Sequence, residues 1–190
     1  KKLDKNTDHF LDNSQIHYLK KVLKLKEGEP LFIHDGEGSR YVSTFDGKNA
    51  VRINDSTTKQ RKFSITLLAP VLKKNQLEFM LQKSVEIGVK KIYLYISEKS
   101  KHSFKLEKEE KKIKRYDEII TSAFLQSENF YKPNLNIVRS ITDFNFDVFR
   151  QIIVLDQYSD NFLDKKVSCD LIVSGGEYGF DDREMKIIRK

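Results

Sequence analysis

The feature that most constrains this fold is the alternation of short apolar runs with amphipathic segments beyond about residue 62. Strands are predicted at residues 63–69, 91–96, 135–138, 151–155 and 171–173. Helices are predicted at residues 75–87, 107–126 and 144–149, the first of them ending at Gly88. Strands that alternate with helices form a mostly parallel sheet covered by helices. We therefore predict an α/β domain over residues 62–190.

The first third of the chain has a different pattern, which is typical of β-hairpins. Strands are predicted at residues 31–33, 41–45 and 50–53, separated by Asp-Gly turns. Before these strands, a helix is predicted with Ser14 as its N-cap. This helix extends to about Leu25 and is stopped by Gly28. These signals predict a small antiparallel β-barrel or sandwich. A polar, basic stretch at residues 55–62 places the domain boundary near residue 61, which gives domains 1–61 and 62–190.

One loop of the second domain carries the strongest functional signal. Residues 174–180, Ser-Gly-Gly-Glu-Tyr-Gly-Phe, directly follow the apolar strand predicted at 171–173. Three glycines let this glycine loop turn sharply and bring bare backbone groups against a ligand. Asp181 and Asp182 then stand where a helix N-cap is expected. This arrangement is typical of the place where an α/β sheet holds a small molecule. An ordinary strand-to-helix turn is the alternative.

Composition narrows the classes of function. A net charge of +7 and a pI near 9.3 favour a polyanionic partner such as nucleic acid. No apolar run approaches the roughly 18 residues that a membrane span needs. The single cysteine, Cys169, excludes an internal disulfide framework and suits a reducing compartment, so we expect a cytoplasmic protein. With one cysteine and four scattered histidines, no metal site is expected.

Five local patterns occur in a fixed order along the chain. They are His-Tyr-Leu-Lys-Lys-Val-Leu-Lys at 17–24, Gln-Lys-Ser-Val-Glu-Ile-Gly-Val at 82–89, Ser-Glu-Lys-Ser at 97–100, Ala-Phe-Leu-Gln-Ser at 123–127, and the glycine loop. In this order and at these intervals they resemble the RsmE-like family of the SPOUT superfamily. The resemblance extends from about Ile16 to Lys190. Members of this family use S-adenosylmethionine to methylate N3 of a uridine in 16S ribosomal RNA.

The resemblance implies a specific architecture and specific partners. Residues 1–61 would form a PUA-like β-barrel, and residues 62–190 a SPOUT-type α/β domain with a C-terminal trefoil knot, a rare exception to unknotted folding. S-adenosylmethionine would bind in that knot beside a homodimer interface. The RNA partner would be 16S rRNA or the small ribosomal subunit, with the target base displaced from its stack.

The resemblance also implies cofactor-binding residues around the glycine loop: Leu155, Asp156, Ser174, Gly175, Gly176, Glu177, Gly179 and Phe180. Neutral uracil carries a proton on N3, and that proton must leave, helped by a base or by stabilisation of the anion. Glu177 is the candidate catalytic residue. It either orients the cofactor or a base edge, or merely caps the following helix, where carboxylates are favoured in any case.

RNA contacts are expected from eight polar or basic side chains: His17, Lys20, Lys21, Lys24, Arg40, Lys83, Lys99 and Ser100. Lys20, Lys21 and Lys24 have a helical spacing that suits phosphate contacts, although a solvated basic face is the plain alternative. For Glu86, in the second pattern, an i,i+4 pair with Lys90 is the structural alternative to RNA contact. Lys99 and Ser100 follow a strand at its carboxyl end, where ligands of α/β proteins gather.

The chain departs from the family pattern at several positions. In the glycine loop, Gly176 replaces a proline and Tyr178 replaces a glycine, which raises the question of a positive φ at the tyrosine. Lys24 and Lys99 replace arginines, and residues 125–129 read Leu-Gln-Ser-Glu-Asn. The chain begins with Lys1 rather than Met and ends at Lys190 inside a predicted helix, so we expect further residues at both ends. The leucine-glycine and arginine-rich segment that completes the family's pocket is absent from this sequence. Two competing hypotheses are a catalytically impaired RNA-binding module and a nucleotide-binding protein, the latter without a phosphate-loop lysine motif.

Overall fold

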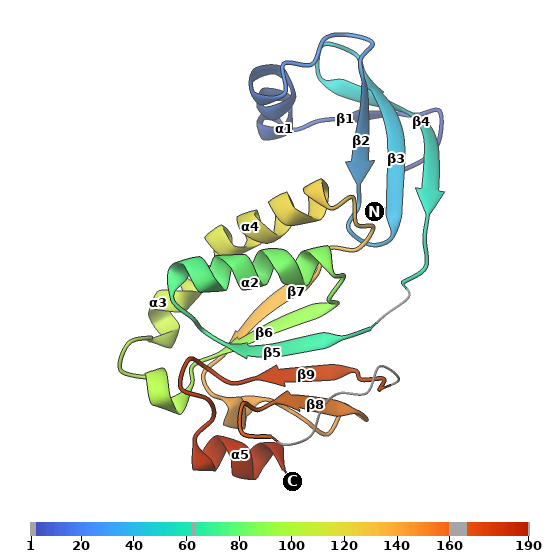
Figure 1. Ribbon diagram of the computed structural model, residues 1–190. Coiled ribbons are helices and arrows are strands. Elements are labelled where there is room, and N and C mark those ends of the chain that lie inside the picture. Colours follow the sequence, from blue (N-terminus) through green and yellow to red (C-terminus); the bar gives the residue numbers. More distant parts are fainter. Residues whose placement is uncertain (1–2, 62–63, 160–166, 190) are drawn as a thin grey trace. The chain divides into compact units, whose positions relative to one another are not determined.

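The computed structural model describes residues 3–61, 64–159 and 167–189. The chain divides into two compact units, Lys1–Arg61 and Lys62–Lys190 (Figure 1).

The first unit is built on one antiparallel sheet with the strand order β1-β4-β3-β2. Its strands are β1 (Asp8–Phe10), β2 (Pro30–His34), β3 (Ser39–Phe45) and β4 (Ala50–Thr58). Asp35 and Asp46 order the two hairpin turns, because each carboxylate accepts two backbone N–H groups at 2.8 and 2.9 Å. The three predicted hairpin strands are confirmed. Strand β1 is an addition, because three residues are too few to show an alternating pattern.

The predicted helix of the first unit is shorter than expected and begins earlier. Helix α1 (Asn13–His17) is capped by Asp12 rather than Ser14, and Gln15 completes the capping box. A π-helical turn, Tyr18–Val22, follows and buries Leu19 against Phe45 and Val51. Lys24 has a φ of 54°, so the helical segment ends before it and not at Gly28. The helical spacing expected for Lys20, Lys21 and Lys24 is therefore wrong for Lys24.

The second unit contains a five-stranded sheet in which every neighbouring pair is parallel, with the order β7-β6-β5-β9-β8. Its strands are β5 (Thr66–Pro70), β6 (Lys91–Tyr95), β7 (Asn134–Val138), β8 (Ile152–Leu155) and β9 (Leu171–Ser174). The predicted parallel sheet is confirmed. The last strand along the chain, β9, lies between β5 and β8, so the glycine loop emerges from the interior of the sheet.

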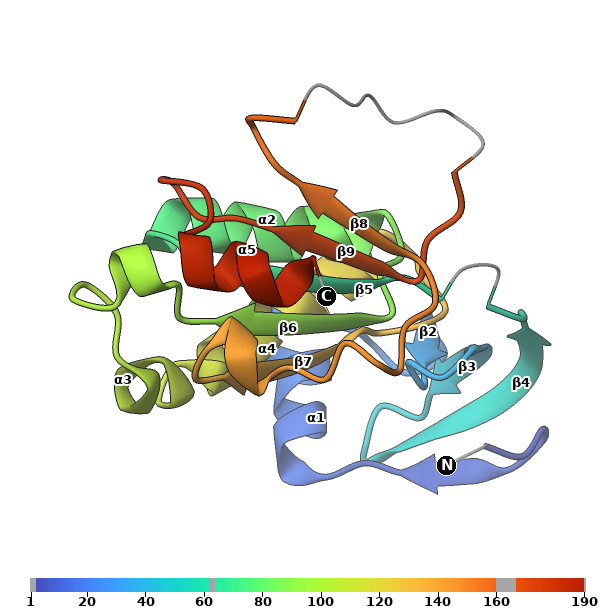
Figure 2. The ribbon, with the colours of Figure 1, turned by 90° about the horizontal axis from the view of Figure 1, so that it is seen from below.

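Helices cover both faces of this sheet. Helices α2 (Lys74–Glu86) and α4 (Ile113–Gln126) lie on one face, and α5 (Asp182–Ile188) lies on the other (Figures 1 and 2). The first layer is held by fully buried aliphatic and aromatic side chains, among them Leu77, Leu81, Val85, Ile92, Leu94, Ile120 and Phe124. The second layer buries Leu68, Tyr95, Leu171, Val173 and Phe180. Helix α2 ends as predicted, with Gly88 at a φ of 85°.

The long helix predicted at 107–126 is broken in two. Helix α3 (Leu106–Glu110) is separated from α4 by a turn at Lys111 and Lys112. The break turns Glu109 inward, where its carboxylate accepts hydrogen bonds from the Tyr116 hydroxyl (2.6 Å) and the Lys112 ammonium (2.8 Å). Burial, together with the Glu109 carboxylate, raises the pKa of Tyr116. The spacing of apolar residues in the sequence does not indicate that a charged side chain turns inward to a buried partner.

The short helix predicted at 144–149 is wrong. A single 3-10 turn, Ile141–Asp143, precedes this segment, which is not helical. Phe144 packs against the rings of Phe146 and Phe149, with centroid distances of 5.0 and 5.6 Å. Residues two positions apart do not face each other on a helix, so the contact between Phe144 and Phe146 requires a non-helical path.

The described ranges contain neither a membrane-spanning helix nor a cluster of potential metal ligands. No helix there has the length and apolar character to cross a bilayer. Over the same ranges, no three His, Cys, Asp or Glu side chains are grouped so as to hold a metal ion.

Candidate functional site

The carboxyl ends of β5, β6 and β9 meet at one edge of the parallel sheet, as they must when neighbouring strands point the same way. Three segments follow these strand ends: residues 71–73, residues 97–104 and the glycine loop. Together they enclose a cavity of about 110 Å³. This edge cavity is lined by Val71, Leu72, Lys73, Ser97, Lys99, Ser100, Ser103, Phe104, Gly176, Glu177, Tyr178 and Gly179.

The glycine loop closes on itself as a tight turn. The Gly179 N–H donates to the Gly176 carbonyl at 2.9 Å, and Gly179 has a φ of 67°, a value that side chains disfavour. A Cβ on Gly175 would lie 3.2 Å from the Phe180 ring and from the Gly179 carbonyl carbon. Tyr178 does not adopt a positive φ, and its side chain is exposed. The tyrosine is therefore compatible with the turn.

Two lysines from neighbouring loops hold the glycine loop. The Lys73 ammonium lies 3.0 Å from one Glu177 carboxylate oxygen and 3.1 Å from the other. The hydrogen bond and charge of Glu177 raise the pKa of Lys73. The Lys99 ammonium donates to the Tyr178 carbonyl at 2.7 Å. Both contacts connect the loop after β9 to the segments after β5 and β6.

The cap of α5 is Asp181, so the alternative in which Glu177 caps this helix is wrong. The Asp181 carboxylate accepts the N–H groups of Arg183 and Glu184 at 2.9 and 2.8 Å. Glu184 completes the capping box by accepting the Asp181 N–H at 2.9 Å. With Asp181 in this role, the carboxylate of Glu177 is available to the edge cavity.

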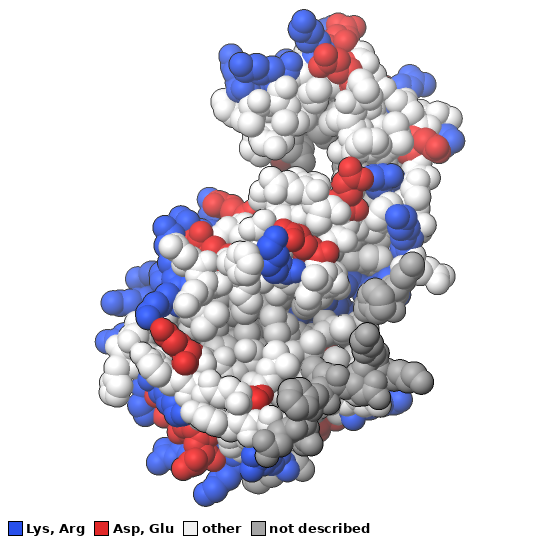
Figure 3. Space-filling view, in the orientation of Figure 1, with Lys and Arg blue, Asp and Glu red and all other residues white. Residues whose placement is uncertain are grey.

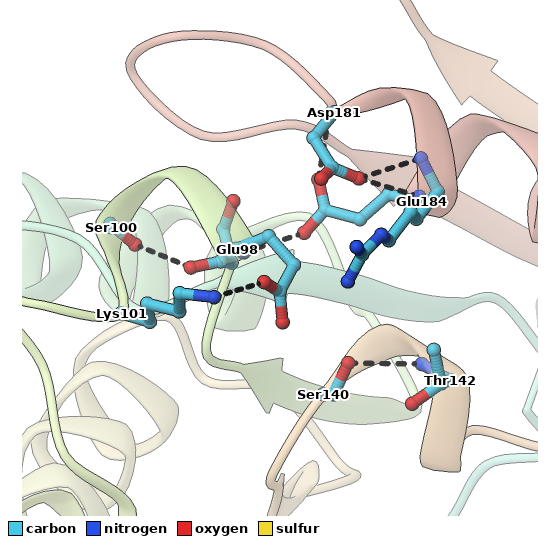
Figure 4. A network of polar contacts seen from close by, with 9 residues as sticks. Glu98, Ser100, Lys101, Ser140, Thr142, Asp181 and Glu184 are labelled. Atoms are coloured by element: carbon cyan, nitrogen blue, oxygen red, sulfur yellow. Dashed lines mark hydrogen bonds and ion pairs between the residues drawn. The ribbon is translucent and has the colours of Figure 1, made fainter.

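Glu184 supports the site from beneath the surface, and sequence reasoning missed this role. Its side chain is 1% exposed, and its second carboxylate oxygen accepts the Glu98 N–H at 3.0 Å. Figure 4 shows Glu184 between the start of α5 and the turn that carries Glu98 and Ser100. The Asp-x-x-Glu spacing from Asp181 to Glu184 was the available signal for its capping role. Its contact with Glu98 joins the α5 start to the segment after β6.

The end of β8 lies beside the glycine loop. Leu155 pairs with Ser174 in the register of β8 and β9, and its side chain is 47% exposed. Asp156 orders the turn that follows, because its carboxylate accepts the Tyr158 N–H at 3.1 Å. Phe180, by contrast, has its side chain in the core beneath the loop. Of the residues expected to contact a cofactor, Leu155 thus presents an apolar surface, and Phe180 packs inward.

The residues expected to bind RNA divide between the two units. Lys99 and Ser100 line the edge cavity, whereas Lys83 is on α2 and pairs with Glu86 at 2.7 Å. The alternative pair of Glu86 with Lys90 is not formed, since the Lys90 ammonium donates to the Ser64 hydroxyl at 3.1 Å.

The other expected RNA-binding residues, His17, Lys20, Lys21, Lys24 and Arg40, belong to the first unit. The first four are exposed, and the Arg40 guanidinium lies 4.9 Å from the centroid of the Phe32 ring. On the face in Figure 3, basic side chains are interspersed with acidic ones. Net charge alone therefore does not mark an RNA surface there.

Comparison with known proteins identifies the family. Residues 59–190 match an RNA methyltransferase domain, and residues 11–53 match an RNA methyltransferase PUA domain. The chain is 32% identical over 190 residues to the ribosomal RNA small subunit methyltransferase E of Mesomycoplasma hyopneumoniae, covering 95% of this chain and 81% of that protein. It is 28% identical to the protein of the same name from Buchnera aphidicola of Acyrthosiphon pisum, covering 98% and 79%.

Solved structures have the same fold. The ribosomal RNA small subunit methyltransferase E of Neisseria gonorrhoeae, bound to S-adenosyl methionine, superimposes with a TM-score of 0.80 at 22% identity, covering 98% of this chain and 81% of that one. A putative methyltransferase of Legionella pneumophila in complex with the same cofactor gives 0.80 at 21% identity, covering 100% and 82%. Together with the sequence matches, this fold places the chain in the ribosomal RNA small subunit methyltransferase E family of RNA methyltransferases.

Proposed function

We propose that this protein transfers a methyl group from S-adenosylmethionine to N3 of a uridine in 16S ribosomal RNA. The observation that carries the proposal is the glycine loop at the carboxyl edge of the parallel sheet, in a chain of this family. Relatives at 32% and 28% identity are named ribosomal RNA small subunit methyltransferase E. Two proteins of similar fold hold S-adenosylmethionine.

The residues around the loop fit this cofactor. A Cβ at Gly175 would crowd the Phe180 ring, and the positive φ of Gly179 disfavours a side chain, so the backbone is bare at both positions. Leu155 adds exposed apolar surface beside those backbone groups, and cofactor sites combine such surfaces with a few placed polar groups. When bound, S-adenosylmethionine supplies an electrophilic methyl group. We assign its contacts to Leu155, Asp156, Ser174, Gly175, Gly176, Glu177, Gly179 and Phe180, the last through its backbone.

Glu177 is our candidate for the residue that orients the target base. Its carboxylate lines the edge cavity, and its side chain is 44% exposed. The Lys73 ammonium, 3.0 Å away, restricts the directions in which this carboxylate points. A carboxylate held in this way can accept a hydrogen bond from an N–H edge, such as N3–H of uracil.

RNA binding is assigned to both units. In the first unit we assign phosphate or positioning contacts to His17, Lys20, Lys21, Lys24 and Arg40, and in the second to Lys83, Lys99 and Ser100. The exposed ammonium groups and the net charge of +7 support this assignment.

Finer features of the family complete the proposal. The first unit would form a PUA-like barrel, in line with the match of residues 11–53. The second would carry a C-terminal trefoil knot, and the insertion of β9 between β5 and β8 is compatible with such a path. We further propose that the protein is a homodimer, because closed two-fold pairing is the commonest assembly. We also propose that it is cytoplasmic. Light scattering after size exclusion tests the dimer.

Methyl transfer to the native substrate tests the function. The full-length protein is incubated with S-adenosylmethionine carrying a labelled methyl group and with small ribosomal subunits from cells that lack this modification. A methyl group on N3 blocks the Watson–Crick edge, so we expect labelled 16S RNA and a primer-extension stop at one uridine. Calorimetry should give micromolar affinity for the cofactor, which is about −8 kcal/mol. Absence of label from the RNA, or label without a stop at a uridine, contradicts the proposal.

A further inference from the structure

One residue that lines the edge cavity, Ser97, has a buried hydroxyl group without a partner among the described residues. Ser97 is 1% exposed, and its Oγ makes no hydrogen bond to any residue within the described ranges. The backbone of Ser97 is fixed without this hydroxyl, since its carbonyl accepts both the Ser100 N–H at 2.9 Å and the Ser100 hydroxyl at 3.3 Å. A buried polar group without a partner costs stability, so such groups are rare unless they have another role.

The side chain of Ser97 faces the glycine loop. A Cβ added at Gly176 would lie 3.9 Å from the Ser97 Cβ, which is ordinary contact. Ser97 lines the edge cavity together with the loop residues. A ligand edge that enters the cavity therefore lies beside the Ser97 side chain, whose hydroxyl reaches it by rotation about the Cα–Cβ bond.

The size and charge of the cavity limit what can enter it. Its volume of about 110 Å³ is well below the roughly 300–1,000 Å³ of pockets that enclose a whole small molecule. It therefore admits one edge of a ligand. Two ammonium groups, Lys73 and Lys99, and one carboxylate, Glu177, line it, which leaves one net positive charge. This positive charge favours an electron-rich oxygen.

We infer that Ser97 donates a hydrogen bond to a carbonyl oxygen of the target uracil, and that this contact stabilises the negative charge that develops on the base. The inference deepens the proposed function and rests on it. In the transfer, the N3–H bond breaks and the proton leaves to solvent base. The N3 electron pair forms the new N–CH₃ bond as the S–CH₃ bond breaks. The electrons of the S–CH₃ bond stay on sulfur, which becomes a neutral thioether. Charge on N3 spreads to the two flanking carbonyl oxygens, where a fixed donor stabilises it.

The test compares Ser97→Ala with Ser43→Ala in the full-length protein. Ser43 is the matched control, because its hydroxyl is also buried and without a partner in the described ranges, but it lies inside the sheet of the first unit. Both variants should unfold at the same midpoint as the wild type or at a higher one, since each loses an unsatisfied polar group. Only Ser97→Ala should slow single-turnover methylation at neutral pH, on the order of 100-fold.

Two further readouts separate this role from a structural one. Cofactor affinity measured by calorimetry should be the same in Ser97→Ala and the wild type. The rate loss should shrink as pH rises, because without the donor the bound base ionises only at higher pH. A lower unfolding midpoint, a matching loss of cofactor affinity, or a rate loss independent of pH would each overturn the inference. A wild-type protein that methylates no rRNA refutes the proposed function, whereas an active wild type equalled by Ser97→Ala refutes only the inference.

Discussion

The Tyr95 hydroxyl donates a hydrogen bond of 3.0 Å to the Ser174 carbonyl oxygen. Tyr95 is the last residue of β6 and Ser174 the last of β9, and β5 lies between these two strands. The buried phenol therefore crosses one strand and holds the backbone at the point where the glycine loop begins. Tyr95 thus fixes the start of the glycine loop, and Lys73 and Lys99 fix its middle at Glu177 and Tyr178.

Replacing Tyr95 with phenylalanine should loosen the base of the glycine loop. The variant keeps the ring in the core but leaves the Ser174 carbonyl without this donor. We expect the free energy of unfolding to fall by about 1–3 kcal/mol in urea denaturation. Tyr93→Phe is the matched control, because its ring also packs in this core, against Phe144, and no hydrogen bond of its hydroxyl is found in the described ranges. Equal losses in the two variants would contradict the role of the Tyr95 hydroxyl.

The stability of the protein should fall in alkali, in part through Tyr95. Burial, and secondly the charge of Glu184, raises the pKa of Tyr95 in the folded chain. The unfolded chain releases this proton at its usual pKa of about 10, whereas the folded chain keeps it. Stability is therefore fully present below about pH 10 and decreases as pH rises further. Urea denaturation between about pH 8 and 11 should show a shallower decrease for Tyr95→Phe than for the wild type. If the free energy of unfolding fell equally steeply with pH in Tyr95→Phe and the wild type, Tyr95 would not contribute to the loss of stability in alkali.

Alanine at adjacent glycines should have opposite effects. A Cβ at Gly175 would lie 3.2 Å from the Phe180 ring, whereas at Gly176 the nearest atom would be 3.7 Å away, on Pro70. Gly176 does not have a positive φ. We expect Gly175→Ala to destabilise the fold by about 1–3 kcal/mol and to weaken cofactor binding in calorimetry. Gly176→Ala should stabilise it by about 0.4–1 kcal/mol, because the unfolded chain loses freedom. If Gly176→Ala destabilised the protein more than Gly175→Ala, the geometry of the glycine loop would differ from this description.

The parts of the fold that sequence predicted are those encoded locally. Strands β5 to β9 are short apolar runs, and α2 combines one apolar face with a stop at Gly88. The N-cap at Asp181 was also predicted, because capping chemistry depends on neighbouring residues. Signals of this kind require no knowledge of distant contacts.

What sequence could not predict depends on distant contacts. Glu98 and Glu184 are 86 residues apart and meet only because β6 ends at the edge where α5 begins. The break before α4 accompanies the hydrogen bond between the Glu109 carboxylate and the Tyr116 hydroxyl, which no local pattern predicts. The Ser97 hydroxyl, which has no partner in the part of the chain that the structure describes, depends on the residues packed around it, so no sequence pattern indicates it.

The exposed ring of Phe32 should contribute to RNA binding by stacking on a base. Phe32 is 60% exposed, and the Arg40 guanidinium lies 4.9 Å from the centroid of its ring. Aromatic rings flanked by arginine are typical surfaces for unstacked bases. Phe32→Ala should weaken binding to a 16S rRNA fragment by about 1–3 kcal/mol in fluorescence titration. The fold should be unaffected, since the side chain is mainly in solvent.

The conservative variant Phe32→Tyr separates stacking from other effects at this position. It keeps the aromatic face, so its RNA affinity should equal that of the wild type. The salt dependence of RNA binding offers a second check. Phenylalanine carries no charge, so its replacement removes no phosphate contact. The slope of affinity against salt should therefore be the same for Phe32→Ala and the wild type, whereas loss of Lys20 or Lys21 should make it shallower. Wild-type affinity in Phe32→Ala, or a loss in Phe32→Tyr as large as in Phe32→Ala, would exclude stacking at this ring.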